Sequence, residues 1–202
     1  MSRLAGRASP AQQKKLLLEL LPDQGAWTED EYLWLTDHTQ RLVEFTDGFL
    51  EVLPIPTDRH QSILGNLFLL FHAFVTPRGG KVHFAALRLR LRSDQFREPD
   101  LLLLLDAKDP RRQNRFWTGA DLVLEVVSED NPERDLIQKR NEYARAKIPE
   151  YWIVNPLTET ILVFQLKGTR YRKPAEYARG TQAASLVLPG FSVNVGDAFD
   201  AD

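Results

Sequence analysis

The chain has 202 residues, of which 43% are hydrophobic and 27% charged, and it contains no cysteine. This composition suits one globular domain with a sizeable core, and it excludes disulfide scaffolds and Cys-ligated zinc. The formal net charge of −2 excludes a global positive field, so any binding to nucleic acid requires a local basic face. No apolar segment is long enough to span a membrane and no signal peptide pattern precedes one, so we expect no membrane partner and a cytoplasmic protein.

Helices and a hairpin are expected in the first part of the chain. The pattern predicts outer helices at 9–21 and 28–35, a β-hairpin at 41–53, and a long apolar helix at 59–75. The hairpin closes at Asp47-Gly48, a pair that tolerates positive φ. The long helix is apolar over much of its circumference, so we expect it to lie against a sheet.

Leucine and arginine alternate along residues 81–92, which predicts a half-buried strand. Its arginine face is either simply solvated or a stripe that contacts DNA phosphates through Arg88 and Arg90. A loop at 106–119 then places Arg111 and Arg112 near aromatic residues. Such a loop suits a nucleic-acid contact, but it also suits ordinary surface closure.

The remaining elements predict an α/β (α+β) fold with a mixed central sheet flanked by helices. In chain order they are strands at 101–105 and 122–127, a helix at 131–146, strands at 151–154 and 160–166, and shorter strands and turns at 170–199. We expect a single domain over 1–202. Its parts are a helical extension at 1–36, a core at 37–170 and C-terminal strands at 171–202.

Two acidic residues occupy positions where burial is costly. Asp100 directly precedes five leucines, and Glu125 lies inside the apolar strand at 122–127. Asp100 suits either a turn or a metal ligand, and Glu125 suits either an arginine pair or a metal ligand. If the two strands pair, both carboxylates converge on one hard divalent cation, Mg²⁺ or Mn²⁺. Such a site indicates phosphodiester hydrolysis.

A lysine near the two acids would hold the attacking water or the scissile phosphate. An acid-x-lysine strand would place that lysine at position 127, where this chain has valine. Asp135, Lys139 and Tyr143 are spaced by four residues and therefore share about one face of the helix at 131–146. Lys139 is thus a candidate to reach the space beside Val127, although a solvated lysine is the plain alternative.

Further candidates lie upstream of the two acids. Glu44 and Glu51 are both candidates for a third acid near the metal. His60, at the start of the long helix, is either a capping residue or a group that supports a ligand. Tyr143 is expected to pack with its hydroxyl at the edge of the site.

An ordered set of motifs resembles the Uma-two family of restriction endonucleases, in the PD-(D/E)XK nuclease superfamily. The set comprises Glu44, Asp47-Gly48, His60-Gln61, Pro99-Asp100, Glu125, Arg134-Asp135, Lys139, Tyr143 and the run Ile148–Val154. The resemblance covers about residues 28 to 166. It implies a restriction-endonuclease-like fold, a divalent metal and a lysine displaced onto the helix, as Lys139 would be. It implies no particular substrate.

We therefore expect a divalent-metal-dependent endonuclease that hydrolyses DNA. A non-catalytic binding or scaffold protein on a nuclease-like fold is the alternative, and a metal phosphohydrolase for small substrates is a third hypothesis. Cutting both strands favours a homodimer, and the apolar segments at 14–21 and 186–199 are candidate contacts.

Overall fold

The computed structural model describes residues 9, 11, 18–128 and 131–200. Its helical elements are α2 (Glu29–Asp37), α3 (Asp58–Val75), the 3₁₀ turn η1 (Thr76–Arg78), the π-helical segment η2 (Arg134–Lys139), α4 (Arg140–Arg145) and α5 (Val195–Phe199). The strands are β1 (Val43–Thr46), β2 (Phe49–Val52), β3 (Lys81–Phe84), β4 (Leu89–Arg92), β5 (Gln95–Arg97), β6 (Leu101–Leu104), β7 (Leu122–Val126), β8 (Glu150–Asn155), β9 (Thr160–Lys167), β10 (Arg170–Tyr171), β11 (Ala175–Ala178), β12 (Gln182–Ala184) and β13 (Ser192–Asn194).

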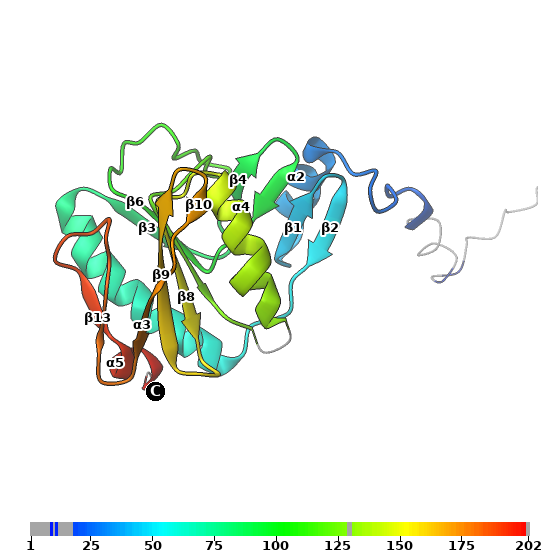
Figure 1. Cartoon of the computed structure of the whole chain (residues 1–202). Coiled ribbons are helices and arrows are strands. Elements are labelled where there is room, and N and C mark those ends of the chain that lie inside the picture. Colours follow the sequence, from blue (N-terminus) through cyan, green and yellow to red (C-terminus); the bar gives the residue numbers. More distant parts are fainter. Residues whose placement is uncertain (1–8, 10, 12–17, 129–130, 201–202) are drawn as a thin grey trace, which may run out of the picture.

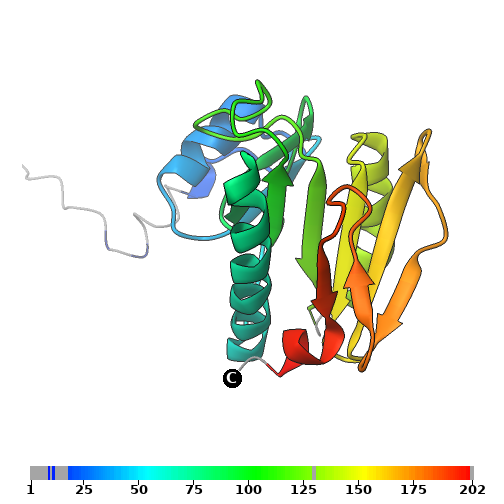
Figure 2. The same ribbon diagram turned by 90° about the vertical axis from the view of Figure 1, so that its left-hand side faces the viewer.

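A large mixed sheet carries the fold. Its strand order is β10-β9-β8-β7-β6-β3, with β11 also pairing β9, and only the β7–β8 pair is parallel among the described pairings of this sheet. A second sheet, in the order β2-β1-β5-β4, lies beside it with α2 (Figure 1). Helix α3 stands on one side of the large sheet and α4 on the other, as Figure 2 shows. The observed α+β architecture confirms the predicted fold class.

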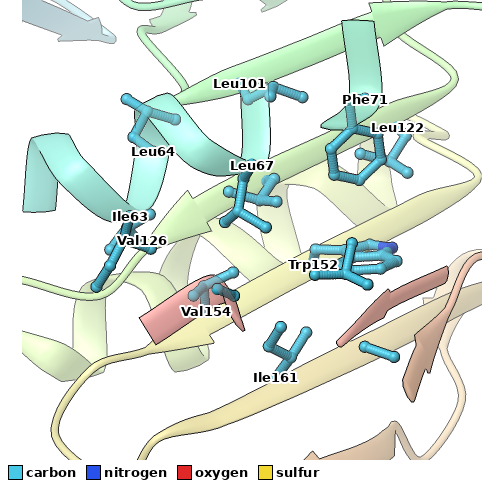
Figure 3. Packing of buried hydrophobic residues seen from close by; sticks show 14 of the residues in the cluster. Ile63, Leu64, Leu67, Phe71, Leu101, Leu122, Val126, Trp152, Val154 and Ile161 are labelled. Atoms are coloured by element: carbon cyan, nitrogen blue, oxygen red, sulfur yellow. The ribbon is translucent and has the colours of Figure 1, made fainter. Parts of the chain in front are cut away.

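Helix α3 supplies one side of the main apolar core. Ile63, Leu64, Leu67 and Phe71 point from the helix towards the strands, where Trp152 is among the side chains that receive them (Figure 3). Each fully buried side chain of this size contributes about 1.5–3 kcal/mol relative to an exposed one. The predicted apolar helix at 59–75 and its position against a sheet are therefore confirmed.

Alternate residues of the central strands serve opposite faces. In β7, Leu122, Leu124 and Val126 face α3, whereas Val123 belongs to the apolar cluster on the η2–α4 side. Since side chains alternate along a strand, Glu125 also faces η2 and α4. All four leucines of β6 are fully buried, which confirms that this strand is covered on both faces.

The single strand predicted over 81–92 is wrong. The chain forms β3, which pairs with β6 in the large sheet, and then β4, which pairs with β5 in the small one. Leu89 is fully buried and its alternation with arginine is real. A period of two is the same in either sheet, so the sequence could not reveal the change of partner.

Three local predictions have different outcomes. The hairpin is confirmed, with φ of 48° at Asp47 and 87° at Gly48. The helix predicted at 131–146 begins with the π-helical segment η2 before α4 continues it. The helix predicted at 9–21 falls mostly on residues outside those described.

The C-terminal segment is part of the core, which corrects the expectation of an exposed contact at 186–199. Phe191 packs against Phe71 at a ring-centroid distance of 4.4 Å, and Val195 is fully buried. Leu186 is the large apolar side chain of this segment that stays exposed. The other expected contact, 14–21, falls mostly outside the described residues. Within the described part of the chain, no helix is long and apolar enough to cross a membrane.

Candidate active site

Asp100 and Glu125 lie on neighbouring antiparallel strands. The register pairs Leu101 with Leu124, so it extends to place Asp100 opposite Glu125. The backbone N–H of Val126 donates to Asp100 Oδ2 at 2.7 Å, which fixes this carboxylate at the end of β7. The Asp100 side chain remains 17% exposed, whereas that of Glu125 is buried at 3%. One carboxylate therefore faces the solvent and the other lies behind it.

Lys139 lies beside Glu125, as the helix spacing predicted. Its Nζ is 3.0 Å from Glu125 Oε2 and 3.1 Å from Asp135 Oδ1. The Tyr143 hydroxyl donates to Glu125 Oε1 at 2.5 Å. Val127 is buried in the apolar cluster on this side of the sheet. A lysine from η2 thus supplies the ammonium group beside Glu125, and π-helical turns of this kind are frequent at functional sites.

Glu44 joins this cluster from the small sheet, and Glu51 lies at its rim. The Glu44 side chain is 1% exposed, and its Oε1 lies 3.8 Å from Lys139 Nζ. Arg134 bridges the two acids, with Nη2 at 2.6 Å from Glu44 and Nη1 at 3.0 Å from Glu51. Because the Glu51 side chain is 55% exposed, Glu44 is the better placed of the two candidates for a third acid.

The cluster contains several buried carboxyl groups, and the positively charged side chains near them do not neutralise all of them equally. Burial raises the pKa of Glu125 above its usual range, Lys139 opposes this shift, and Asp100 and Asp135 add to it. Burial also raises the pKa of Asp135. For Glu44, burial acts in the same direction, but Lys139, Arg97 and Arg134 together hold the pKa of this carboxyl below its usual range.

His60 contacts the more exposed acid from the first turn of α3. Thr57 caps this helix by accepting the His60 backbone N–H at 3.2 Å, and His60 Nε2 lies 3.2 Å from Asp100 Oδ2. Burial acts to lower the pKa of His60, but Asp100 holds it above its usual range. The other ring nitrogen, Nδ1, is buried and has no hydrogen-bond partner among the described residues.

A cavity of about 350 Å³ opens over the two carboxylates. Its charged lining residues include Asp100, Glu125, Lys139 and Arg134. Its apolar lining residues include residues 53–56, Leu64 and Phe84. The cavity thus combines charged groups with apolar surface that suits the uncharged part of a ligand.

The donor chemistry of this cluster fits a small hard cation. Mg²⁺ is usually held by one or two carboxylates with water completing its shell, and Asp100 and Glu125 supply such a pair. Among the described residues, no group of three or more histidine, cysteine or acidic side chains is arranged as a full ligand set. The residues therefore fit a metal site with two carboxylate ligands. The observation that favours a cation there is the number of acidic side chains around the buried Glu125.

The arginines considered for DNA contact are largely engaged by acids. Arg88 binds Asp37 at 2.8 Å and Arg90 binds Glu29 at 2.9 Å. Arg111 binds both Asp109 and Asp121, at 2.7 and 2.8 Å. Arg112 differs, because its guanidinium donates to a backbone carbonyl, that of Ala107, at 2.8 Å.

Sequence reasoning missed the support behind Glu44. Arg97 is buried between Glu44 at 3.4 Å and Glu142 at 2.7 Å. Glu98 is 5% exposed and accepts from the Val43 backbone at 3.0 Å. Burial, reinforced by Glu44, raises the pKa of Glu98 to about 7. The visible signal was the run of charges Arg97-Glu98 directly before Pro99-Asp100, where the chain enters a buried strand.

Comparison with known proteins identifies the family of this chain. The family model Uma2, described as "Putative restriction endonuclease", matches residues 29–196. The chain belongs to the Uma2 family. The resemblance to Uma-two proteins found in the sequence is thereby confirmed. The match spans every residue of the cluster, from Glu44 to Tyr143.

A solved structure shares the fold of this Uma2 chain. It is the crystal structure of a "putative nuclease belonging to DUF820" from Anabaena variabilis, with a TM-score of 0.72 at 18% sequence identity. The alignment covers 86% of this chain and 97% of that one. No protein with a curated description matches the chain.

Proposed function

We propose that the chain is a divalent-metal-dependent endonuclease that hydrolyses phosphodiester bonds in DNA. The observation that carries the proposal is the contact of Lys139 Nζ with Glu125 at 3.0 Å, next to Asp100, at the floor of an open cavity. Family membership supports the reaction class, since the Uma2 family model carries the description "Putative restriction endonuclease".

Each residue of the cluster has a distinct part in this proposal. Asp100 and Glu125 hold Mg²⁺ or Mn²⁺, which supplies charge neutralisation at the phosphate and activates water when bound. Lys139 places its ammonium beside Glu125, where it can orient the attacking water or contact the scissile phosphate. Tyr143 holds Glu125 through its hydroxyl, and Glu44 keeps Lys139 and Arg134 in place.

The test is cleavage of supercoiled plasmid with Mg²⁺ or Mn²⁺ by the purified full chain. Asp100→Asn and Glu125→Gln should each abolish nicking and linearisation, because each removes a ligand charge. Arg145→Gln, an exposed change on α4, is the matched control and should cut like the wild type. Equal cutting by Glu125→Gln would refute the proposal, since the activity would then come from a contaminant.

A non-catalytic binding or scaffold protein is the second candidate. Two observations favour it: the described residues offer no ligand group of three, and Lys139 Nζ is already held between Glu125 and Asp135. Calorimetry that detects no heat with Mg²⁺ or Mn²⁺, together with no cleavage of single-stranded or duplex DNA, would select this candidate. Cleavage of small phosphodiesters without cleavage of DNA would select the small-substrate phosphohydrolase.

Cutting both strands of a duplex also leads us to propose a homodimer, because a two-fold axis relates two sites in the way that the two strands require. Light scattering coupled to size-exclusion chromatography measures the mass directly. A monomer of 23.2 kDa that linearises plasmid in one binding event would contradict the dimer.

A further inference from the structure

A second hollow lies between the edge strand β3 and the loop at 106–119. Its volume is about 390 Å³, and polar side chains line most of it: His83, Lys108, Arg112, Gln113 and Asn114. Consecutive residues of β3 serve the two cavities, since Phe84 lines the first and His83 the second. None of these polar side chains belongs to the carboxylate cluster.

One acid, Asp109, lines this hollow, and it shares the guanidinium of Arg111 with Asp121. By contrast, neither Lys108 nor Arg112 forms an ion pair within the described part of the chain. Two cations therefore line the hollow without a direct ion pair among the described residues, in a protein whose net charge is −2.

The imidazole of His83 lines the same hollow and lies near two cations, Lys81 and Arg112. Burial lowers the pKa of His83, and the charges of Lys81 and Arg112 lower it further. The ring packs edge-on against the buried Trp117 at a centroid distance of 5.4 Å, which fixes its position at the side of the hollow. A neutral imidazole beside two cations is a ready hydrogen-bonding group for an anion.

We propose that this hollow binds a phosphate group. Arg112 and Lys108 supply the charge, and the Gln113 and Asn114 amides supply uncharged donors, a combination that matches the oxygens of a phosphate. The phosphate belongs either to the backbone of a nucleic acid or to a free nucleotide or inorganic phosphate. The site is separate from the carboxylates: His83 is opposite Leu102, about 7 Å along β6 from Asp100 at two residues' rise.

The experiment is a titration of the full chain with inorganic phosphate at constant ionic strength, read by NMR of the His83 imidazole. We expect a saturable shift of its resonances and a rise in its pKa, because a bound anion offsets the charges of Lys81 and Arg112. Arg112→Gln and Lys108→Gln should each weaken binding by at least ~5-fold, as expected for loss of one charge-assisted contact. Arg145→Gln on α4 is the matched control and should bind like the wild type.

Lys108→Gln removes a charge without disturbing the conformation of the loop, because Lys108 is exposed and its side chain contacts no partner among the described residues. Arg112→Gln alone loses a contact within the loop, to Ala107. A wild-type titration without a saturable shift would overturn the proposal. Equal weakening in Arg145→Gln would overturn it as well, since the effect would then be general screening.

Two further arms identify the source of the phosphate. In the first, short duplex DNA is added to Asp100→Asn protein. A shift of the His83 resonances that inorganic phosphate reverses by competition would identify a nucleic-acid backbone as the source. In the second, a nucleoside monophosphate is added, and a shift of His83 that DNA does not produce would identify a free phosphate compound. Both results support the site, and a His83 that responds to none of the three ligands refutes it. Since no arm requires cleavage, failure here is distinct from failure of the proposed nuclease.

Discussion

Glu125 and Glu150 are buried glutamates on neighbouring parallel strands of one sheet, yet their surroundings differ in kind. Glu150 accepts four hydrogen bonds from uncharged donors: Trp152 Nε1 at 2.6 Å, Ser185 Oγ at 2.7 Å, and the backbone N–H groups of Leu186 and Val187 at 2.6 and 2.9 Å. Its two oxygens are thus well occupied. These contacts tie the C-terminal segment to the start of β8.

Glu125 has two partners among the described residues, the Tyr143 hydroxyl and a lysine that it shares with Asp135. Other acids surround it, and it lines an open cavity. Both glutamates are almost fully buried, so burial alone does not distinguish them. They differ in the number of uncharged donors around the carboxylate and in the sign of the neighbouring charges.

The largest expected effect is on cleavage. Glu125→Gln should lower the rate of plasmid nicking by about 10²–10³-fold or more, since 10²–10³-fold is typical of removing one electrostatic group from an active site. Glu150→Gln should stay within a few-fold of the wild type at temperatures where it is folded, because Glu150 is absent from the cavity. Comparable losses in the two variants would break the distinction between these glutamates.

The order reverses for stability. Glu150→Gln should lower the free energy of unfolding by about 2–3 kcal/mol, because the new NH₂ group faces the backbone N–H groups of Leu186 and Val187 and cannot accept from either. Glu125→Gln should change it by less than about 1 kcal/mol, since Lys139 keeps Asp135 and the repulsion from nearby acids is relieved. Urea denaturation followed by circular dichroism measures both. A Glu125→Gln protein that is the less stable of the two would contradict this prediction.

Metal binding should also distinguish Glu125 from Glu150. Mg²⁺ at about ten times its dissociation constant should stabilise the wild type and Glu150→Gln by about 1.4 kcal/mol, which raises Tm by a few degrees. Asp100→Asn and Glu125→Gln should show no such rise. Differential scanning calorimetry with and without EDTA measures it, and an equal rise in all four proteins would place the ion elsewhere.

The smallest effect concerns an exposed carboxylate, Asp37, which lies between Arg88 and Arg115 at 2.8 and 2.7 Å. Hydrogen bonds from Arg88 and Arg115 hold the pKa of Asp37 below its usual range. A lowered pKa in the folded state stabilises above the unfolded pKa, and that contribution is lost as pH falls through the folded pKa, below about 4.

Asp37→Asn should therefore cost less than about 1 kcal/mol at pH 7, because the pair is partly exposed and screened by solvent. The difference from the wild type should be smaller at pH 3 than at pH 7, because part of this contribution is lost as the carboxylate is protonated. Urea titrations at the two pH values test this, and a larger cost at pH 3 than at pH 7 would contradict it. This surface ion pair gives a small reference value for the change in free energy of unfolding, against which the two buried glutamates are compared.

Much of the site's geometry was predictable from local patterns. The unbroken apolar runs around Asp100 and Glu125 indicated buried strands, and the spacing of four residues placed Asp135, Lys139 and Tyr143 on one helix face. Both signals are local, because side-chain direction follows from the period of a strand or helix. The roles of these residues stay predictions until the cleavage and metal-binding experiments are done.

Other features depended on contacts between residues distant in the sequence. The alternation at 81–92 did not reveal that β3 and β4 join different sheets, and the arginines' acidic partners on α2 lie far away in the chain. The same holds for Glu150, whose donors come from residues 185–187 as well as Trp152.

The sequence by itself thus determined the elements, the two suspect acids and the helix position of the lysine, since these follow from periodicity and from the cost of burying charge. Only the tertiary structure decided which charges meet: Lys139 with Glu125, and Arg134 with Glu44. It also placed Arg112 and Lys108, which form no ion pair among the described residues, at the second hollow. The physical reason is that electrostatic energy depends on distance and burial in space, and neither can be read from separation along the chain.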